Sequence, residues 1–190
     1  MLCDGDVHIA LSSSREFCKD VEFRLFITDP VVLITPLTHP WASRSSVSID
    51  DLMTVQFIMR EKYSGTLEVL ENGLIDAGMS LDQLNTVLTL GNSEAIALAV
   101  QEGIGVGFVS KMVVCRLVED KVAQIHVQGL DLFQNIYIGC HMGHPPTSAQ
   151  AAFWKFVKDP HNPVVQSLNN MHAADDWPSF VDFCQMETAV

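Results

Sequence analysis

The sequence is short of basic residues, and it has no long apolar run. Lysine and arginine number 11 against 23 aspartates and glutamates, which gives a formal net charge of −12 over 190 residues. A protein that grips nucleic acid needs clustered lysine and arginine against the phosphates, so this balance argues against that class while leaving room for a small-anion pocket. No apolar run approaches the length of a membrane span, so no membrane partner is expected.

Cysteine is sparse and shows no metal or redox spacing. No CxxC pair occurs among the five cysteines, which are Cys3, Cys18, Cys115, Cys140 and Cys184. An odd, scattered set predicts no disulfide framework and favours a reducing compartment. Met1 is not followed by a basic segment and an apolar run, so no signal peptide is visible. We therefore expect a cytoplasmic protein.

The apolar content is sufficient for a core, because hydrophobic residues make up 48% and charged residues only 18% of the chain. Apolar periodicity predicts strands over residues 6–11, 22–28, 31–34, 55–59, 86–90, 105–110, 122–127 and 136–140. It predicts helices over residues 48–52, 67–77, 95–103, 111–118 and 149–157. Asp29-Pro30 is expected to break the chain between two strands. The alternation over residues 55–110 indicates an α/β fold with a mostly parallel sheet.

One turn carries the strongest functional signal. Ser64, Gly65 and Thr66 follow a predicted strand and stand just ahead of a predicted helix. A helix N-terminus offers unpaired N–H groups and partial positive charge to an anion, and hydroxyls add donors. The alternative is that Ser64 or Thr66 only caps the helix, and this turn alone favours the cap.

Two further polar edges shift that balance. Asn92 and Ser93 precede the next predicted helix, and Ser110 follows a glycine-rich strand. Ligands in open α/β folds bind beyond the carboxyl ends of the strands, next to helix N-termini. Three such edges together favour an anion site over a simple cap.

Taken in order, four segments resemble the effector-binding domain of LysR-type transcriptional regulators. Pro36–Pro40 resembles the family's P-x-x-H-P stretch, and Val47–Leu52 its serine-containing segment before a leucine. Arg60–Thr66 is similar to the R-E-x-x-S-G-T turn, and Gly91–Ser110 to the S-x-E-A-I block with its following glycines. The series covers about residues 5–157.

The resemblance implies a two-lobed, periplasmic-binding-protein-like (type 2) fold with a small effector in an interlobe cleft. Residues 1–35 and 131–158 would form a partial first lobe, 36–130 a complete second lobe, and 159–190 a C-terminal tail. The strands Val31–Pro36 and near Ile136–Cys140 would cross between the lobes. The implied partners are a small anionic effector and further copies in a homodimer or tetramer, with no cofactor.

The resemblance also implies the effector-binding residues Ser64, Gly65, Thr66, Tyr63, Val109, Ser110 and Thr35. Tyr63 stands where many relatives have glycine, which would narrow the cleft or change the effector. The family's N-terminal winged helix-turn-helix, linker helix and opening half-lobe are not seen, so we expect a truncated regulator that reaches DNA only through an absent domain. Loss of core strands would leave an exposed sheet edge prone to association.

Other readings are weaker. Cys140, His141 and His144 have a spacing possible for zinc, but no second ligand pair is evident, so no metal is expected. Ser110 lacks the G-x-S-x-G elbow of a nucleophile, and no acid–base pair is evident, so we expect no enzyme. A free-standing solute-binding module of the same fold, a non-sensing fragment and an α/β enzyme remain the alternatives.

Overall fold

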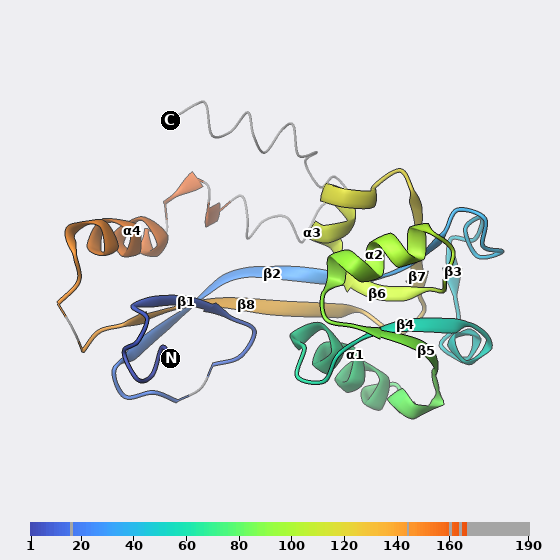
Figure 1. The fold of residues 1–190 in the computed structure, drawn as a ribbon, viewed down its shortest axis with the longest axis horizontal. Helices are drawn as coiled ribbons and strands as arrows, with labels where there is room; N and C mark the ends of the chain where they lie inside the picture. Colours follow the sequence, from blue (N-terminus) through green and yellow to red (C-terminus); the bar gives the residue numbers. More distant parts are fainter. Residues whose placement is uncertain (16, 144, 160, 164, 167–190) are drawn as a thin grey trace. The chain divides into compact units, whose positions relative to one another are not determined.

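The chain folds into two compact units. The computed structural model describes residues 1–15, 17–143, 145–159, 161–163 and 165–166. Of the described residues, unit 1 contains 1–29 and those after 134, and unit 2 contains 30–134. Two strands, β2 (Val21–Pro36) and β8 (Leu132–His141), each contribute residues to both units (Figure 1). Most of the expected tail at 159–190 lies outside the described residues.

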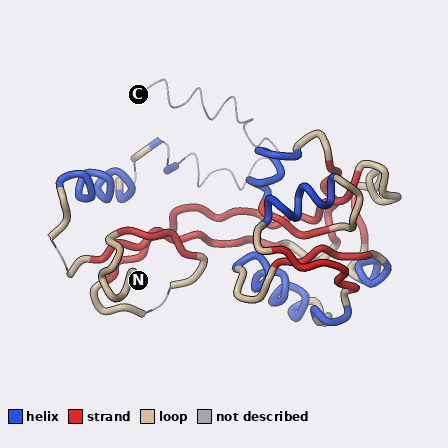
Figure 2. Tube along the Cα trace, in the orientation of Figure 1, coloured by secondary structure: helices blue, strands red, loops and turns tan. Residues whose placement is uncertain are grey.

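The larger sheet is mainly antiparallel. Its order is β1-β8-β2-β7-β3, and β6 pairs with β2 off this path. The strands are drawn in red in Figure 2. The additional strands are β1 (Ile9–Ser12), β3 (Ser46–Val47), β6 (Gly107–Ser110) and β7 (Val122–Val127). Strand β8 pairs antiparallel with β1, and β2 pairs antiparallel with β6 and β7, whereas β3 and β7 pair in parallel. The expected parallel arrangement therefore does not extend to this sheet.

The parallel arrangement does hold in the second sheet. Strands β4 (Gln56–Arg60) and β5 (Asn85–Leu90) pair in parallel. On the other side of β4, the amide of Ile58 donates to the Val106 carbonyl oxygen, and the amide of Val106 donates to that of Gln56, both over 2.8 Å. Strand β4 is thus hydrogen-bonded along both edges, as its unbroken apolar run predicts.

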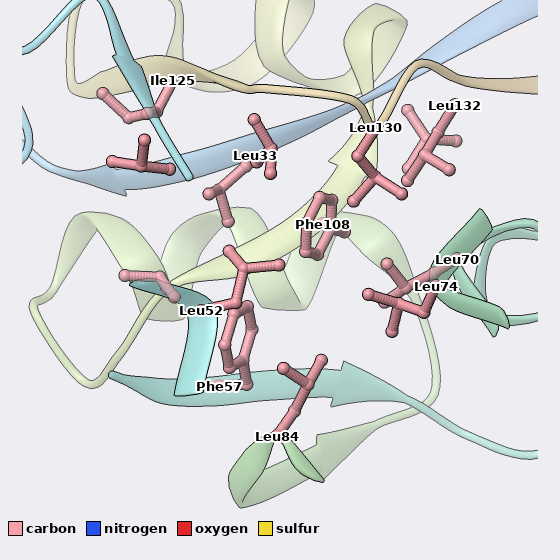
Figure 3. Close-up of a cluster of buried hydrophobic side chains, with 14 of the residues drawn as sticks. Leu33, Leu52, Phe57, Leu70, Leu74, Leu84, Phe108, Ile125, Leu130 and Leu132 are labelled. Carbon is pink, nitrogen blue, oxygen red and sulfur yellow. The ribbon is translucent and has the colours of Figure 1, made fainter. Parts of the chain in front are cut away.

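Side-chain alternation along β4 sorts the core of unit 2 into two clusters. Phe57 and Met59 pack with Leu70 and Leu74 of α1 (Gly65–Asp76), as Figure 3 shows for Phe57 and both leucines. Ile58, between them, packs in the cluster that contains residues of α2 (Ser93–Gln101). Successive strand residues point to opposite faces, so α1 and α2 cover opposite sides of β4 (Figure 1).

Except for α4 (Ser148–Lys158), the remaining helices are short. Residues Asp50–Thr54 form a 3-10 helix, η1, and Leu81–Gln83 form another, η2. The helix expected over 111–118 is divided into α3 (Lys111–Val113) and the π-helical turn η3 (Val114–Val118). Helix α4 lies in unit 1. None of the described helices has the length and apolarity needed to cross a membrane.

The expected strand break at Asp29-Pro30 is wrong, because β2 runs unbroken through both residues. Proline has no N–H to give to a strand ladder, but its fixed φ suits extended backbone. The registers of β2 with β6 and with β7 begin at Val31 and Leu33, beyond Pro30, so neither pairing calls for the missing donor.

The expectation of unpaired cysteines is also wrong for one pair. Cys3 and Cys18 form a disulfide, with their Cα atoms 5.6 Å apart. The two residues flank β1, which pairs antiparallel with β8 from Ile9↔Cys140 to Ser12↔Tyr137. Sequence spacing does not show that the chain turns back after β1, so the pairing had no local signal. Within the described residues Cys115 and Cys140 form no disulfide, and Cys184 lies outside those residues.

Reducing the Cys3–Cys18 bond should lower the melting temperature. The bond joins residues 15 apart, and closing such a loop restrains the unfolded chain by roughly 3 kcal/mol in the chain-entropy account. Thermal melts with and without dithiothreitol test this. The double variant Cys3→Ser/Cys18→Ser should melt at the reduced temperature in both conditions, and Cys115→Ser should keep the wild-type response. Equal melting of oxidised and reduced wild type would contradict the prediction.

Gly105→Ala should destabilise unit 2 by about 1–3 kcal/mol, because an added methyl would overpack the site. A Cβ at Gly105 would lie 2.7 Å from the backbone oxygen of Gln56, on β4. Gly91→Ala is the matched control, since its Cβ would meet nothing within 4 Å. Urea unfolding of both variants checks the difference. If the urea midpoint of Gly105→Ala equals that of Gly91→Ala, the backbone of β4 moves to make room for the methyl group and the prediction is wrong.

Candidate functional site

The turn from β4 into α1 has an unusual backbone at Tyr63. The amide of Ser64 donates to the Glu61 carbonyl oxygen over 3.3 Å, and Tyr63 adopts a φ of 70°. Left-handed backbone favours glycine, because a Cβ crowds the neighbouring carbonyl. That is a physical reason for glycine at this position in proteins with the same turn. The Tyr63 side chain is fully exposed.

Ser64 sits at the N-cap of α1 without acting as a side-chain cap. Its backbone is extended, with φ −72° and ψ 130°, and its hydroxyl makes no capping hydrogen bond. The residue is only 6% exposed, and its Oγ is buried without a partner among the described residues. The capping alternative therefore has no hydrogen bond to support it here. A buried polar atom without a partner calls for an explanation, of which ligand binding is one.

Thr66 is engaged with another part of unit 2. It is 5% exposed, and its Oγ1 donates to Oε1 of Gln134 over 3.1 Å. Gln134, on β8, was not expected from the sequence. No local pattern signals a contact between residues 68 positions apart. The hydroxyl of Thr66 thus fixes the first turn of α1 against β8, while that of Ser64 stays unpaired.

The second predicted helix edge is filled by the protein itself. Asn92 caps α2, since its Oδ1 accepts from the amide of Ala95 over 2.6 Å. Ser93 Oγ accepts from a guanidinium nitrogen of Arg60 over 2.9 Å. Sequence reasoning placed Arg60 in a motif but not in the site, and the structure shows that it links β4 to the start of α2.

Arg60 also lowers the pKa of its neighbour Glu61. Its Nε donates to a carboxylate oxygen of Glu61 over 2.9 Å, and this hydrogen bond holds the pKa of Glu61 below its ordinary value. The Arg60 side chain is largely buried, so it acts as a fixed part of the turn. Glu61 and Ser93 thus leave little of the guanidinium's hydrogen-bonding capacity for a ligand.

The other expected site residues lie on the larger sheet. Val109 and Ser110 pair with Val32 and Val31 of β2, and α1 packs against their strand, β6. Val109 is fully buried, whereas Ser110 is half-buried at the end of β6. Thr35 is fully buried, and its hydroxyl donates to the Pro36 carbonyl oxygen over 3.4 Å. The effector contacts of these three residues stay predictions.

Metal binding gains no support from the part of the chain that is described. No group of three histidine, cysteine, aspartate or glutamate side chains within it is placed to hold a metal ion. His144, the third member of the possible zinc set, lies outside the described residues.

The family model of the LysR substrate binding domain matches residues 1–161. The chain belongs to this family. An HTH-type transcriptional regulator of Methanocaldococcus jannaschii is 34% identical over 141 residues, which are 73% of this chain and 47% of that protein. The RuBisCO operon transcriptional regulator of Allochromatium vinosum is 27% identical over 158 residues, 83% of this chain and 51% of that protein. This LysR substrate-binding domain thus spans about half the length of the curated relatives it matches.

Solved structures show the same fold. The regulatory domain of Synechocystis CcmR in complex with 2-PG matches with a TM-score of 0.69 and 23% identity, covering 81% of this chain and 73% of that one. The effector-binding domain of QuiR in complex with shikimate matches with a TM-score of 0.69 and 18% identity, covering 82% and 72%. The expected α/β, periplasmic-binding-protein-like (type 2) class is confirmed, and the matched relatives are transcriptional regulators.

Ser64→Ala should stabilise the ligand-free protein by about 1–3 kcal/mol, because it removes a buried hydroxyl that has no partner among the described residues and no hydrogen bond is lost. Asn92→Ala is the matched comparison, because it removes a side-chain cap and should cost about 1 kcal/mol. Urea unfolding of the two variants gives both values. A Ser64→Ala loss as large as that of Asn92→Ala would restore the capping interpretation of Ser64.

Proposed function

We propose that this LysR substrate-binding domain senses a small organic anion that binds at the N-terminus of α1. The observation that carries the proposal is the buried hydroxyl of Ser64, which has no partner among the described residues. It stands at the first turn of a helix of 12 residues, Gly65–Asp76. The helix dipole and unpaired amides at such a turn favour negative charge.

The backbone at this turn offers further donors. The first intrahelical bond of α1 runs from the amide of Glu68 to the Ser64 carbonyl oxygen over 3.0 Å. The amides of Gly65, Thr66 and Leu67 therefore precede the helical ladder and have no carbonyl partner within it. Gly65 has no side chain to keep a ligand from the backbone. A carboxylate or phosphate oxygen at this point would accept from the Ser64 hydroxyl and from these amides.

The solved neighbours support the ligand class in general terms. The matched domain of CcmR was solved with 2-PG and that of QuiR with shikimate. Those ligands belong to those proteins. Because the two proteins are only 18–23% identical to this chain in sequence, the identity of neither ligand transfers to it. They support a small-molecule ligand for this chain, and the α1 terminus supports its negative charge.

Regulation follows from differential affinity in this proposal. A ligand that binds one arrangement of the domain more tightly shifts the population toward it, and by linkage changes whatever that arrangement controls. With a net charge of −12, these 190 residues are poorly suited to hold DNA phosphates. We propose that DNA contact belongs to another part of a longer cytoplasmic regulator, and that the domain works as a homodimer or tetramer.

Thermal melts of the chain with a panel of small carboxylates and phosphate esters test the proposal. A ligand that binds only the native state raises the melting temperature, by an amount set by its concentration over its Kd. Ser64→Ala should weaken the responding anion about tenfold, the equivalent of roughly 1.4 kcal/mol for one hydrogen bond to a charged group. Thr66→Asp should abolish the rise in melting temperature, because the aspartate carboxylate would repel an anion bound at the same turn.

Thr89→Asp is the control, since it adds the same charge at an exposed position of β5 in the same unit. It should keep the wild-type response. Each variant is compared with its own ligand-free melt, because a buried aspartate at position 66 will itself lower stability. If both Ser64→Ala and Thr66→Asp respond as wild type does, the anion does not bind at α1.

A further inference from the structure

Unit 1 contains a cavity that the proposed effector site does not use. It has a volume of about 500 Å³ and is lined by the end of β8, by Met142 and Pro146, and by residues of α4. That volume lies within the range of small-molecule sites in proteins, roughly 300–1,000 Å³. Every lining residue belongs to unit 1, so the cavity is separate from Ser64 and Thr66 in unit 2.

One face of α4 forms a wall of this cavity. Ala151, Trp154, Lys155 and Lys158 all line it, and their spacing of three, four and seven residues places them on the same side of a helix. Trp154 and Cys140 also belong to the small core of unit 1, at 8% and 7% exposure. The wall is therefore anchored in the core at its apolar part and carries two ammonium groups at its polar part.

The indole of Trp154 is incompletely satisfied. Its Nε1 is buried and has no acceptor among the described residues. Buried donors without acceptors are uncommon in native proteins, and each one calls for an explanation. Trp154, which lines the wall, thus also carries an unused donor.

The two lysines differ in what they have available. Lys158 Nζ lies 3.1 Å from a carboxylate oxygen of Glu22 and 5.8 Å from the centre of the Trp154 ring. Lys158 is therefore already in an ion pair, in which Glu22 is shared with Arg24 over 2.7 Å. Lys155 makes no hydrogen bond or ion pair with any residue that the structure describes. Asp159 also lines the cavity, so the site offers one ammonium group without an ion-pair partner beside one negative group.

We propose that this cavity binds a small monocarboxylate with an apolar, ring-sized body. The carboxylate would pair with the Lys155 ammonium, and the body would pack against Met142, Pro146 and Trp154. One unmatched cation suits one negative charge, and Asp159 disfavours dianions such as phosphate. The apolar wall contributes through area removed from water, at about 25 cal/mol per Å². The proposal does not depend on the site at Ser64.

Isothermal titration calorimetry of the full chain with three probes tests the proposal. 2-Naphthoate has both the body and the charge, 2-naphthamide has the body alone, and inorganic phosphate has the charge alone. We expect saturable binding of one 2-naphthoate per chain, at least tenfold weaker binding of 2-naphthamide, and no binding of phosphate in this cavity. Absence of 2-naphthoate binding up to millimolar concentration would overturn the proposal, as would equal affinity for the amide.

Three variants locate the binding. Lys155→Gln should weaken 2-naphthoate about tenfold and leave 2-naphthamide unchanged, and Ala151→Trp should fill the cavity and remove both. Phe153→Ala is the control on the same helix, since Phe153 is 47% exposed and does not line the cavity. It should bind as wild type does. Circular dichroism establishes whether each variant is folded. If Ala151→Trp is not folded, Lys155→Gln still decides the test.

A fourth variant separates this site from the α1 terminus. Ser64→Ala should leave 2-naphthoate binding unchanged. If Ser64→Ala removes it while Ala151→Trp does not, the probe binds at α1, and the cavity proposal fails while the proposed function stands. If Ser64→Ala weakens no anion of the panel but Ala151→Trp loses 2-naphthoate binding, the cavity proposal stands and the proposed function fails.

Discussion

The burial of β4 on both faces is the constraint on which unit 2 depends. Phe57 and Met59 require an apolar partner on one side and Ile58 on the other, and α1 and α2 supply them. Hydrogen bonds along both edges hold the strand in place, through β5 and through Val106. Because β4 leads directly into the turn before α1, and Arg60 at its end reaches Ser93, this packing brings both helix N-termini to one end of the strand.

The two helix N-termini then differ in how fully the protein satisfies them. At α2, Asn92 caps an amide, and Ser93 accepts from Arg60. At α1, Ser64 is buried at 6% exposure and has no partner among the described residues. A buried hydroxyl without a partner costs about 1–3 kcal/mol, so it is unfavourable for folding alone. Such local inconsistencies concentrate where a protein holds a ligand, and this contrast is the reason for proposing α1 as the site.

Unit 1 is held together differently. Its buried cluster has four residues, Ile138, Cys140, Trp154 and Val157, whereas unit 2 has two larger clusters. The Cys3–Cys18 bond and the reciprocal Thr147–Gln150 cap at the start of α4 add local restraints. Cross-links and caps stabilise a structure where apolar burial is limited. The same limited packing leaves the cavity beside Trp154.

The sequence by itself determined the local elements and the family, because both follow from short-range patterns. The strand over 122–127 has the expected bounds, and the strand and helix on either side of Arg60–Thr66 lie within a few residues of theirs. The family followed from short motifs, the longest of which, Gly91–Ser110, covers one helix and the strand after it. Tertiary structure decided the rest: the unbroken β2, the Cys3–Cys18 bond, the bond from Thr66 to Gln134, and the unpaired Ser64 hydroxyl. Apolar period and turn chemistry act over a few residues, whereas a partner 68 positions away, or the lack of one, depends on how the whole chain packs.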